Sequence, residues 1–142
     1  HFTGGLDEMG RRAHMYRKIG EEFIADDFAH EQSIVFETEK GLVIFNSCSH
    51  GGIANIVREV QNAFAGKKIY AVIGGFHMMK LSGMDTLAIP EEEVVETAQE
   101  LKGLGVEEIY TGHCTGNIAF RILKKELGEM VHALGTGETV VF

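Results

Sequence analysis

The clearest indication of the fold lies in residues 41–57, which read GLVIFNSCSHGGIANIV. The apolar, β-rich run Leu42–Phe45 predicts a strand, and the polar, glycine-bearing segment after it predicts a loop that carries His50. Apolar residues then recur at spacings of three and four, as on one face of a helix, and Gly66 can end that helix. These apolar positions are Ile53, Ile56, Val57, Val60 and Phe64.

Strands and helices are also predicted before and after this strand–loop–helix segment. Upstream, Ser33–Phe36 predicts a strand that residues 37–41 join to the next strand as a hairpin. Alternating strands and helices after such a hairpin indicate an α/β layer structure. Downstream we expect strands at residues 69–73, 108–110, 131–134 and 139–142, one helix opened by Pro90, and another over residues 118–127.

The beginning of the sequence does not resemble a self-contained unit. Glycines interrupt it repeatedly, and the pattern predicts one helix there, over Arg11–Phe23. We expect residues 1–31 to lead into a hairpin and β/α units that occupy residues 32–142. The 142 residues would then form a single domain or half of one.

Composition argues against several classes of function. Of the 142 residues, 44% are apolar and 24% are charged, as in ordinary globular proteins. The net charge of −8 argues against nucleic acid as a partner, and no apolar run approaches the ~18 residues that span a bilayer. The two cysteines, Cys48 and Cys114, are too few for a disulfide framework. We therefore expect a cytoplasmic, reducing location without membrane contact.

Three histidines share one kind of position. His50, His77 and His113 each follow an apolar strand directly, inside a glycine-bearing loop. Ligands bind beyond the carboxyl ends of parallel strands, so neighbouring strands would bring the three imidazoles together. Imidazole suits zinc, manganese or iron, and a divalent metal, zinc first, is the expected cofactor. The alternative for each is a structural histidine held by hydrogen bonds, which is how we interpret His1, His14, His30 and His132.

Other polar residues admit two interpretations. Cys48 and Cys114 could be soft metal ligands or a nucleophile, but small residues packed in tight turns are the simpler interpretation. Asp26-Asp27 could ligate a metal or occupy a solvated turn, and the turn is favoured. The glycine pairs 51–52 and 74–75 could hold a phosphate at a helix amino terminus, although no nucleotide-binding fingerprint accompanies them.

Three motifs in this order resemble one branch of the metallo-β-lactamase superfamily. They are residues 41–57, residues 69–77 with the sequence IYAVIGGFH, and residues 110–116 with the sequence YTGHCTG. The branch is named for dihydropterin-ribofuranosylaminobenzene-5′-phosphate synthase and contains many metal-dependent hydrolases. The resemblance runs from about Asp26 to Phe142. It implies a four-layer αββα sandwich with a dinuclear metal site at one edge of the two sheets.

The resemblance also implies roles for particular residues. His50 and His113 correspond to metal ligands, and His77 corresponds to a ligand or to a residue that contacts substrate. The neighbouring residues of the same loops are then expected to bind substrate. They are Gly51, Gly52, Gly75, Cys114 and Thr115.

One family motif is missing from these 142 residues. His-x-His-x-Asp-His occurs nowhere, and the opening residues HFTGG mimic only its tail. We therefore expect the carboxy-terminal half of a metallo-β-lactamase αββα sandwich, a fragment or a natural half. A missing amino-terminal half or a second chain would supply the remaining ligands. Because an isolated half exposes an apolar sheet face, we also expect homo-oligomers.

Two classes of function remain open from the sequence. The first is a metal-dependent hydrolase or synthase that acts on an anionic or phosphate-bearing small molecule, with a pterin-related compound among the candidates. The second is a non-catalytic module that binds one metal weakly or serves only in assembly. A third interpretation, a plain α/β domain with structural histidines, predicts no bound metal.

Overall fold

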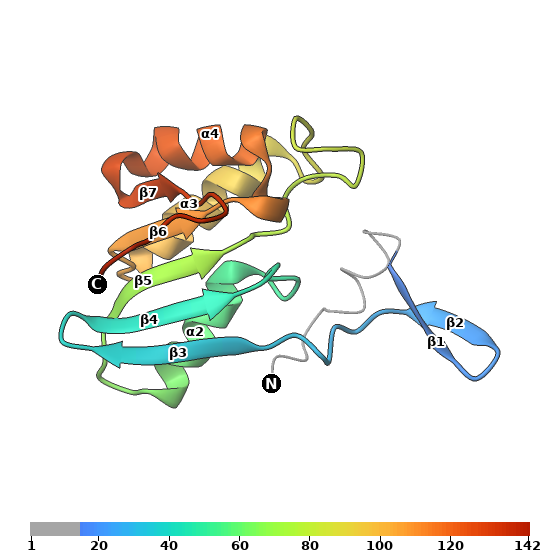
Figure 1. The fold of residues 1–142 in the computed structure, drawn as a ribbon, viewed down its shortest axis with the longest axis horizontal. Helices are drawn as coiled ribbons and strands as arrows, with labels where there is room; N and C mark the ends of the chain where they lie inside the picture. Colours follow the sequence, from blue (N-terminus) through green and yellow to red (C-terminus); the bar gives the residue numbers. More distant parts are fainter. Residues whose placement is uncertain (1–14) are drawn as a thin grey trace.

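The computed structural model describes residues 15–142, and Figure 1 shows their arrangement. A five-stranded sheet forms the centre. Its strands are β3 (Ser33–Thr38), β4 (Gly41–Asn46), β5 (Ile69–Gly74), β6 (Glu108–Thr111) and β7 (Val131–Ala133), and they lie side by side in chain order. The β3–β4 pair is the expected antiparallel hairpin, and every later pair is parallel.

Helices connect the parallel strands. Helix α2 (Ile53–Ala63) joins β4 to β5, α3 (Glu91–Gly103) joins β5 to β6, and α4 (Asn117–Leu127) joins β6 to β7. Two short 3₁₀ turns, η1 (His113–Thr115) and η2 (Gly128–Met130), flank α4. Parallel crossovers are right-handed, and each new strand joins the same edge of the sheet, so the helices gather on one face. The fold is therefore of the α/β class expected from the sequence.

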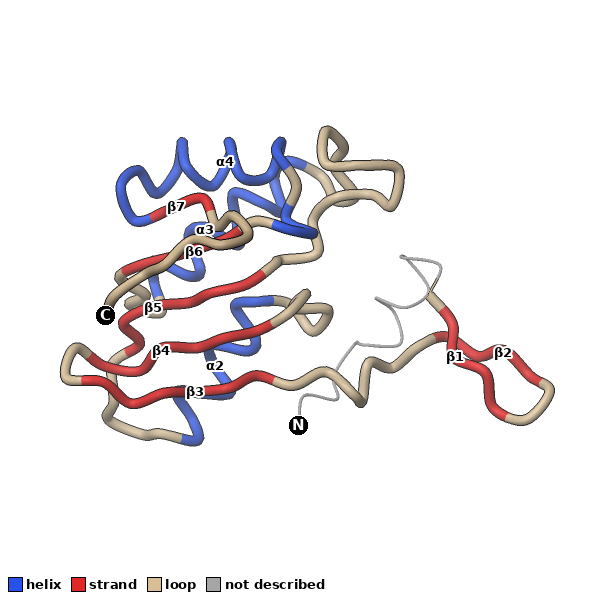
Figure 2. The backbone as a smooth tube through the Cα atoms, in the orientation of Figure 1, coloured by secondary structure: helices blue, strands red, loops and turns tan. Residues whose placement is uncertain are grey.

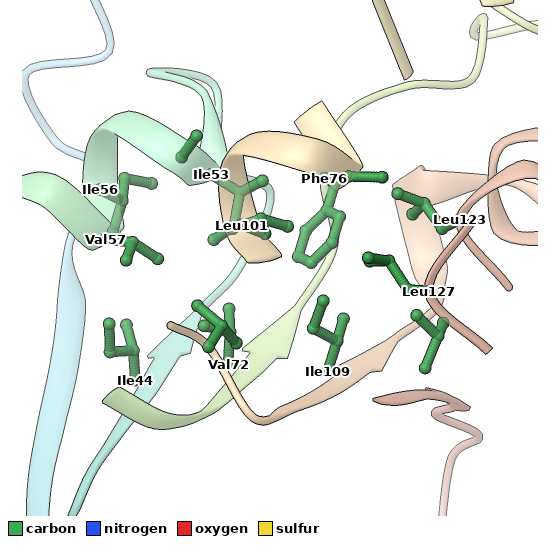
Figure 3. Packing of buried hydrophobic residues seen from close by; sticks show 14 of the residues in the cluster. Ile44, Ile53, Ile56, Val57, Val72, Phe76, Leu101, Ile109, Leu123 and Leu127 are labelled. Carbon is green, nitrogen blue, oxygen red and sulfur yellow. The ribbon is translucent and has the colours of Figure 1, made fainter. Parts of the chain in front are cut away.

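The main core lies between this face and the helices. Ile44, Val72 and Ile109 are neighbours across β4, β5 and β6, and all three are fully buried. Figure 3 shows their side chains directed toward those of the helices, including Leu101 and Leu123. The apolar residues predicted to share one face of α2 supply the neighbouring part of this core, except Phe64, which is exposed at the end of the helix.

The opposite face of the sheet is covered only in part. Val43, Ala71 and Ile73 are buried there, and the ring of Phe142 meets those of Tyr70 and Tyr110 edge-on, with centroids 6.0 and 5.7 Å away. On the outer strand β3, however, Ile34 and Phe36 are 60% and 55% exposed. An apolar strip along β3 therefore faces solvent in this chain.

The predicted helix over Arg11–Phe23 is wrong for the residues that the structure describes. Tyr16–Ile19 and Glu22–Ala25 form two antiparallel strands, β1 and β2, and residues 11–14 lie outside the described part of the chain. The turn between the strands contains Gly20 at φ +60°, a left-handed conformation that ends a helix but suits a tight turn. Figure 2 shows this hairpin projecting away from the five-stranded sheet.

The predicted strand at residues 139–142 is also wrong. The chain after β7 forms no further strand, and the Gly135–Glu138 turn is closed by the Glu138 carboxylate, which accepts the Gly135 N–H at 2.7 Å. The ring of Phe142 lies instead against the rings of Tyr70 and Tyr110 on the open sheet face. Within residues 15–142, no helix is long and apolar enough to cross a membrane.

Candidate metal centre at the carboxyl edge of the sheet

The three candidate histidines follow three adjacent parallel strands. His50 lies beyond β4, His77 beyond β5 and His113 in the turn after β6. The rings of His50 and His77 are 4.4 Å apart between centroids. His113 borders the same loop, because a Cβ atom added at Gly75 would lie 3.3 Å from its Cδ2 atom. The parallel register thus brings all three loops to one edge of the sheet, as the sequence predicts.

The backbone at this edge is unusual. His77 and His113 have φ values of +51° and +48°, and Ser49 has +56°. Residues other than glycine seldom adopt this left-handed conformation, and it costs on the order of 1 kcal/mol or more at each position. Such conformations cluster where side chains must be aimed at a ligand.

His50 is held firmly by two neighbours. Its ring Nδ1 donates to the Glu31 carboxylate at 2.9 Å, and its backbone N–H donates to the same oxygen at 3.0 Å. The ring of Phe28 stacks on the imidazole with centroids 4.0 Å apart and planes only 4° from parallel. With Nδ1 engaged by a carboxylate, Nε2 is the nitrogen available for a ligand, which is the usual arrangement of a metal-binding histidine.

The electrostatics of the edge follow from these contacts. Burial by itself would raise the pKa of Glu31, but hydrogen bonds from the His50 ring and from the N–H groups of His50 and Gly51 outweigh it and hold the pKa below its ordinary value. Burial lowers the pKa of His77, and the nearby His50 and His113 imidazoles lower it further, against the opposite influence of Glu31. A lowered pKa favours the neutral imidazole, the form that binds metals.

Two thiols lie on the His113 side of the edge. Cys48 Sγ is 3.4 Å from His113 Nε2, and Cys114 is buried beside them. The three candidate ligand atoms of Cys48, His113 and Cys114 all lie within 4.8 Å of one another. Burial, together with the nearby Cys48, raises the pKa of the Cys114 thiol to about 12. The two cysteines, for which the sequence leaves both metal ligands and packing residues open, thus lie at one location beside His113.

Buried hydroxyl groups hold the loops in place. Ser49 donates to the Gly75 carbonyl at 2.7 Å, which ties the His50 loop to the His77 loop. Thr115 accepts the Phe76 N–H at 2.9 Å and pairs with Thr111 at 2.6 Å, which ties the His77 loop to the His113 turn. In this conformation the Thr115 hydroxyl is directed into the protein.

The glycines expected to contact substrate lie in the same loops. Gly51 donates its N–H to Glu31 at 3.3 Å, and Gly52 donates its N–H to the Ser49 carbonyl at 2.9 Å. Gly75 occupies the space between the His50 and His113 loops, where a Cβ atom would be 3.0 Å from the Ser47 carbonyl oxygen. Only glycine fits at position 75 without a shift of its neighbours, because the two flanking loops approach its backbone closely.

The remaining predicted positions lie outside this cluster. Asp26 accepts the Phe28 N–H at 2.8 Å, and Asp27 pairs with Arg17 at 2.7 Å, so both acids serve the turn before β3. His132 forms a 2.6 Å hydrogen bond with Glu108 on the neighbouring strand. His30 is largely exposed, and His1 and His14 lie outside the described residues.

Sequence reasoning missed Glu31 and Phe28, the two residues that orient His50. Both lie in the irregular segment between β2 and β3, about twenty residues before the histidine that they contact. No periodicity or spacing marks such a contact. The only available signal was a carboxylate two residues before the first strand of the hairpin.

Comparisons with known proteins bear on the family of the chain. No protein-family model matches the chain. The chain is 35% identical over 128 residues to the 7,8-dihydropterin-6-methyl-4-(β-D-ribofuranosyl)-aminobenzene-5′-phosphate synthase of Methanocaldococcus jannaschii, an alignment that covers 90% of the chain and 41% of the synthase. A solved structure described as a metal-dependent hydrolase of the β-lactamase superfamily superimposes with a TM-score of 0.79 and 31% identity.

The structural match covers 89% of the chain and 46% of the solved hydrolase. The chain thus spans less than half the length of either relative. The sequence match and the structural match nevertheless each extend over nearly all of this chain. The chain belongs to the metallo-β-lactamase superfamily, in the branch that includes the dihydropterin-ribofuranosylaminobenzene phosphate synthase.

Proposed function

We propose that the protein carrying this chain is a metal-dependent hydrolase or synthase, and that His50, His77 and His113 contribute to its metal site. The observation that supports this most directly is the pair formed by His50 and His77. Glu31 fixes the His50 imidazole through Nδ1. The ring centroid of His77 lies 4.4 Å from that of His50, at the edge where the parallel strands end. A structural histidine would not require this combination of a carboxylate, a stacked ring and a second imidazole.

The residues present fit a divalent metal. Imidazole nitrogens bind zinc well, and they also bind manganese and iron, so the histidines alone do not select one of these metals. When bound, such a metal supplies Lewis acidity that activates water and polarises the bond under attack. The residues of the chain would hold and orient the site: Glu31 and Phe28 fix the His50 ring, and Ser49 and Thr115 fix the loops.

The proposed substrate is an anionic, phosphate-bearing small molecule, with a pterin-related compound as the first candidate. The support is the relative in Methanocaldococcus jannaschii, whose name describes a 5′-phosphate product joined to a pterin. Gly51, Gly52, Gly75, Cys114 and Thr115 belong to the loops that would border this substrate.

The remaining metal ligands would come from outside these 142 residues, from more of the same polypeptide or from a second chain. The His-x-His-x-Asp-His motif of the family is absent from the sequence, and the chain matches less than half of each relative. The exposed Ile34 and Phe36 offer an apolar surface that such a partner could cover. The same surface favours the alternative, a non-catalytic assembly module that forms homo-oligomers.

Metal content and turnover distinguish these functions. The protein carrying this chain would be purified as wild type, as His50→Ala and as His113→Ala, with His30→Ala as the matched control because its side chain is 71% exposed. We expect both site variants to lose most of the bound metal and of the phosphoester hydrolysis, and the control to keep both. Full metal content and full turnover in both site variants would exclude the proposed site.

A further inference from the structure

A second group of potential ligands lies beside the histidine pair. Cys48, His113 and Cys114 come from the loops after β4 and β6, two strands that are not neighbours in the sheet. They meet because β5, which lies between these strands, continues into Gly75. A Cβ atom at that position would lie 2.5 Å from Cys114 Sγ. A missing side chain thus opens the space in which the two thiols and the imidazole approach one another.

The spacing of these atoms suits one metal ion. Bonds of about 2.3 Å to sulfur and ~2.0–2.1 Å to nitrogen, at tetrahedral angles, place neighbouring ligand atoms roughly 3.5–3.8 Å apart. Cys48 Sγ and His113 Nε2 are 3.4 Å apart, and all three ligand atoms lie within 4.8 Å of one another. Only a small adjustment of side chains would bring all three to a common ion.

One contact in the surroundings would support a thiolate once a metal has displaced the thiol proton. The backbone N–H of His77 donates to Cys114 Sγ at 3.3 Å, a contact that would support negative charge on sulfur. Cys114 is buried, Cys48 is partly exposed and His113 is exposed, so the group has a closed side and a side that faces solvent. The three protein ligands therefore leave room for a fourth from solvent or substrate.

We propose that Cys48, Cys114 and His113 form a thiolate–imidazole site for a soft d¹⁰ cation, with zinc as the natural ion. On binding, each thiol releases one proton to solvent and forms a bond from sulfur to the metal, so the divalent ion replaces two protons. The inference rests on the proposed function only in assigning His113 to a metal. It adds that this side of the site is sulfur-rich and separate from the His50–His77 pair.

Cadmium is a suitable probe, because cadmium–thiolate bonds give an ultraviolet charge-transfer band that imidazole and carboxylate ligands do not. The protein carrying this chain would be stripped of metal, reduced and titrated with cadmium while difference absorbance is recorded. We expect a band that saturates. Cys48→Ser and Cys114→Ser should each lower its intensity about twofold or more, and His30→Ala, a change at an exposed side chain outside the site, should leave it intact. Circular dichroism would confirm that each variant is folded.

Serine replaces cysteine with little change in size, and Cys48 is partly exposed, so Cys48→Ser is the variant least expected to unfold. Failure of the band to appear at saturating cadmium, or an unchanged band in both serine variants, would overturn the inference. Equilibrium dialysis separates this failure from failure of the proposed function. Metal that binds without the band, and is lost in His50→Ala, would leave the histidine site standing and remove the thiolate site.

Discussion

Glu31 accepts two hydrogen bonds from His50 on a single oxygen, from the backbone N–H at 3.0 Å and from ring Nδ1 at 2.9 Å. One carboxylate therefore fixes both the loop and the rotation of the imidazole. The contact joins the segment before β3 to the loop after β4. The site consequently depends on a residue that belongs to neither the strand nor the loop of the histidine.

This relationship predicts the effect of Glu31→Gln. The amide keeps the size of the side chain but removes its charge, so the His50 ring should be less well oriented. We expect metal affinity to fall by about 10–100-fold, the usual effect of removing a carboxylate that orients a metal-binding histidine. Competition with a chromophoric chelator measures it, and Glu129→Gln, a change at a fully exposed side chain, is the control. Equal metal affinity in Glu31→Gln and Glu129→Gln would show that the contact between Glu31 and His50 serves only the structure.

Gly75→Ala should disturb both halves of the site. The added methyl group would lie 2.5 Å from Cys114 Sγ and 3.0 Å from the Ser47 carbonyl oxygen, distances that force the loops apart. We expect the free energy of unfolding to fall by about 1–3 kcal/mol, as for other overpacked positions. Urea denaturation measures the change.

Gly103 provides the matched control for that substitution. It ends α3, and a Cβ atom there would have no neighbour within 4 Å. Gly103→Ala should therefore leave stability unchanged or raise it by up to ~1 kcal/mol. A loss at Gly103 as large as that at Gly75 would mean that close approach is not the cause.

The core between the sheet and the helices gives a third prediction. Leu101 is fully buried between α3 and the strands, so Leu101→Ala should lower the free energy of unfolding by about 2–5 kcal/mol. Leu81→Ala, at a side chain that is 79% exposed, should change it by no more than about 0.5 kcal/mol. Both values come from the same urea titrations, and similar losses at the two positions would contradict the placement of α3.

The sequence predicted the parts of the fold that periodicity controls. The β3–β4 hairpin, the later parallel strands and the three long helices follow from local apolar patterns, and three strand-end histidines do share one edge. The predicted helix over Arg11–Phe23 is wrong where the structure has β1 and β2, because strands of four residues are too short for their alternation to be distinguished from a helical pattern.

The finer features of the site depend on distances through space. Glu31 meets His50 across 19 residues, and Cys48 meets Cys114 across 66. The first contact depends on the course of an irregular segment, and the second on the absence of a side chain at Gly75. Neither is encoded in a local spacing, so the three histidines could be proposed from the sequence, whereas their supporting residues could not.

The exposed strip on β3 predicts association. Ile34 and Phe36 are more than half exposed on a face whose inner residues are buried, and monomeric proteins rarely leave such a surface uncovered. We expect Phe36→Glu to shift the 142-residue chain toward the monomer in analytical ultracentrifugation, and Leu81→Glu to have no such effect. A wild-type chain that stays monomeric at all concentrations would count against this interface.

The proposed ligands of this chain hold a metal less firmly than a complete site would. Catalysis by metals requires that the reacting groups be fixed in position, and the imidazoles and thiols of this chain alone leave coordination positions to solvent. We therefore expect the 142-residue chain to bind zinc or manganese substoichiometrically and to hydrolyse generic phosphoesters poorly. A longer form that includes a His-x-His-x-Asp-His motif should bind metal fully and turn over, and His113→Ala in that form should abolish both. Mass spectrometry of bound metal and a phosphoesterase assay, run on both forms with added metal, provide the comparison. Robust turnover by the short chain that persists in its His113→Ala variant would refute this division of the site, because the catalytic ligands would then have to lie elsewhere.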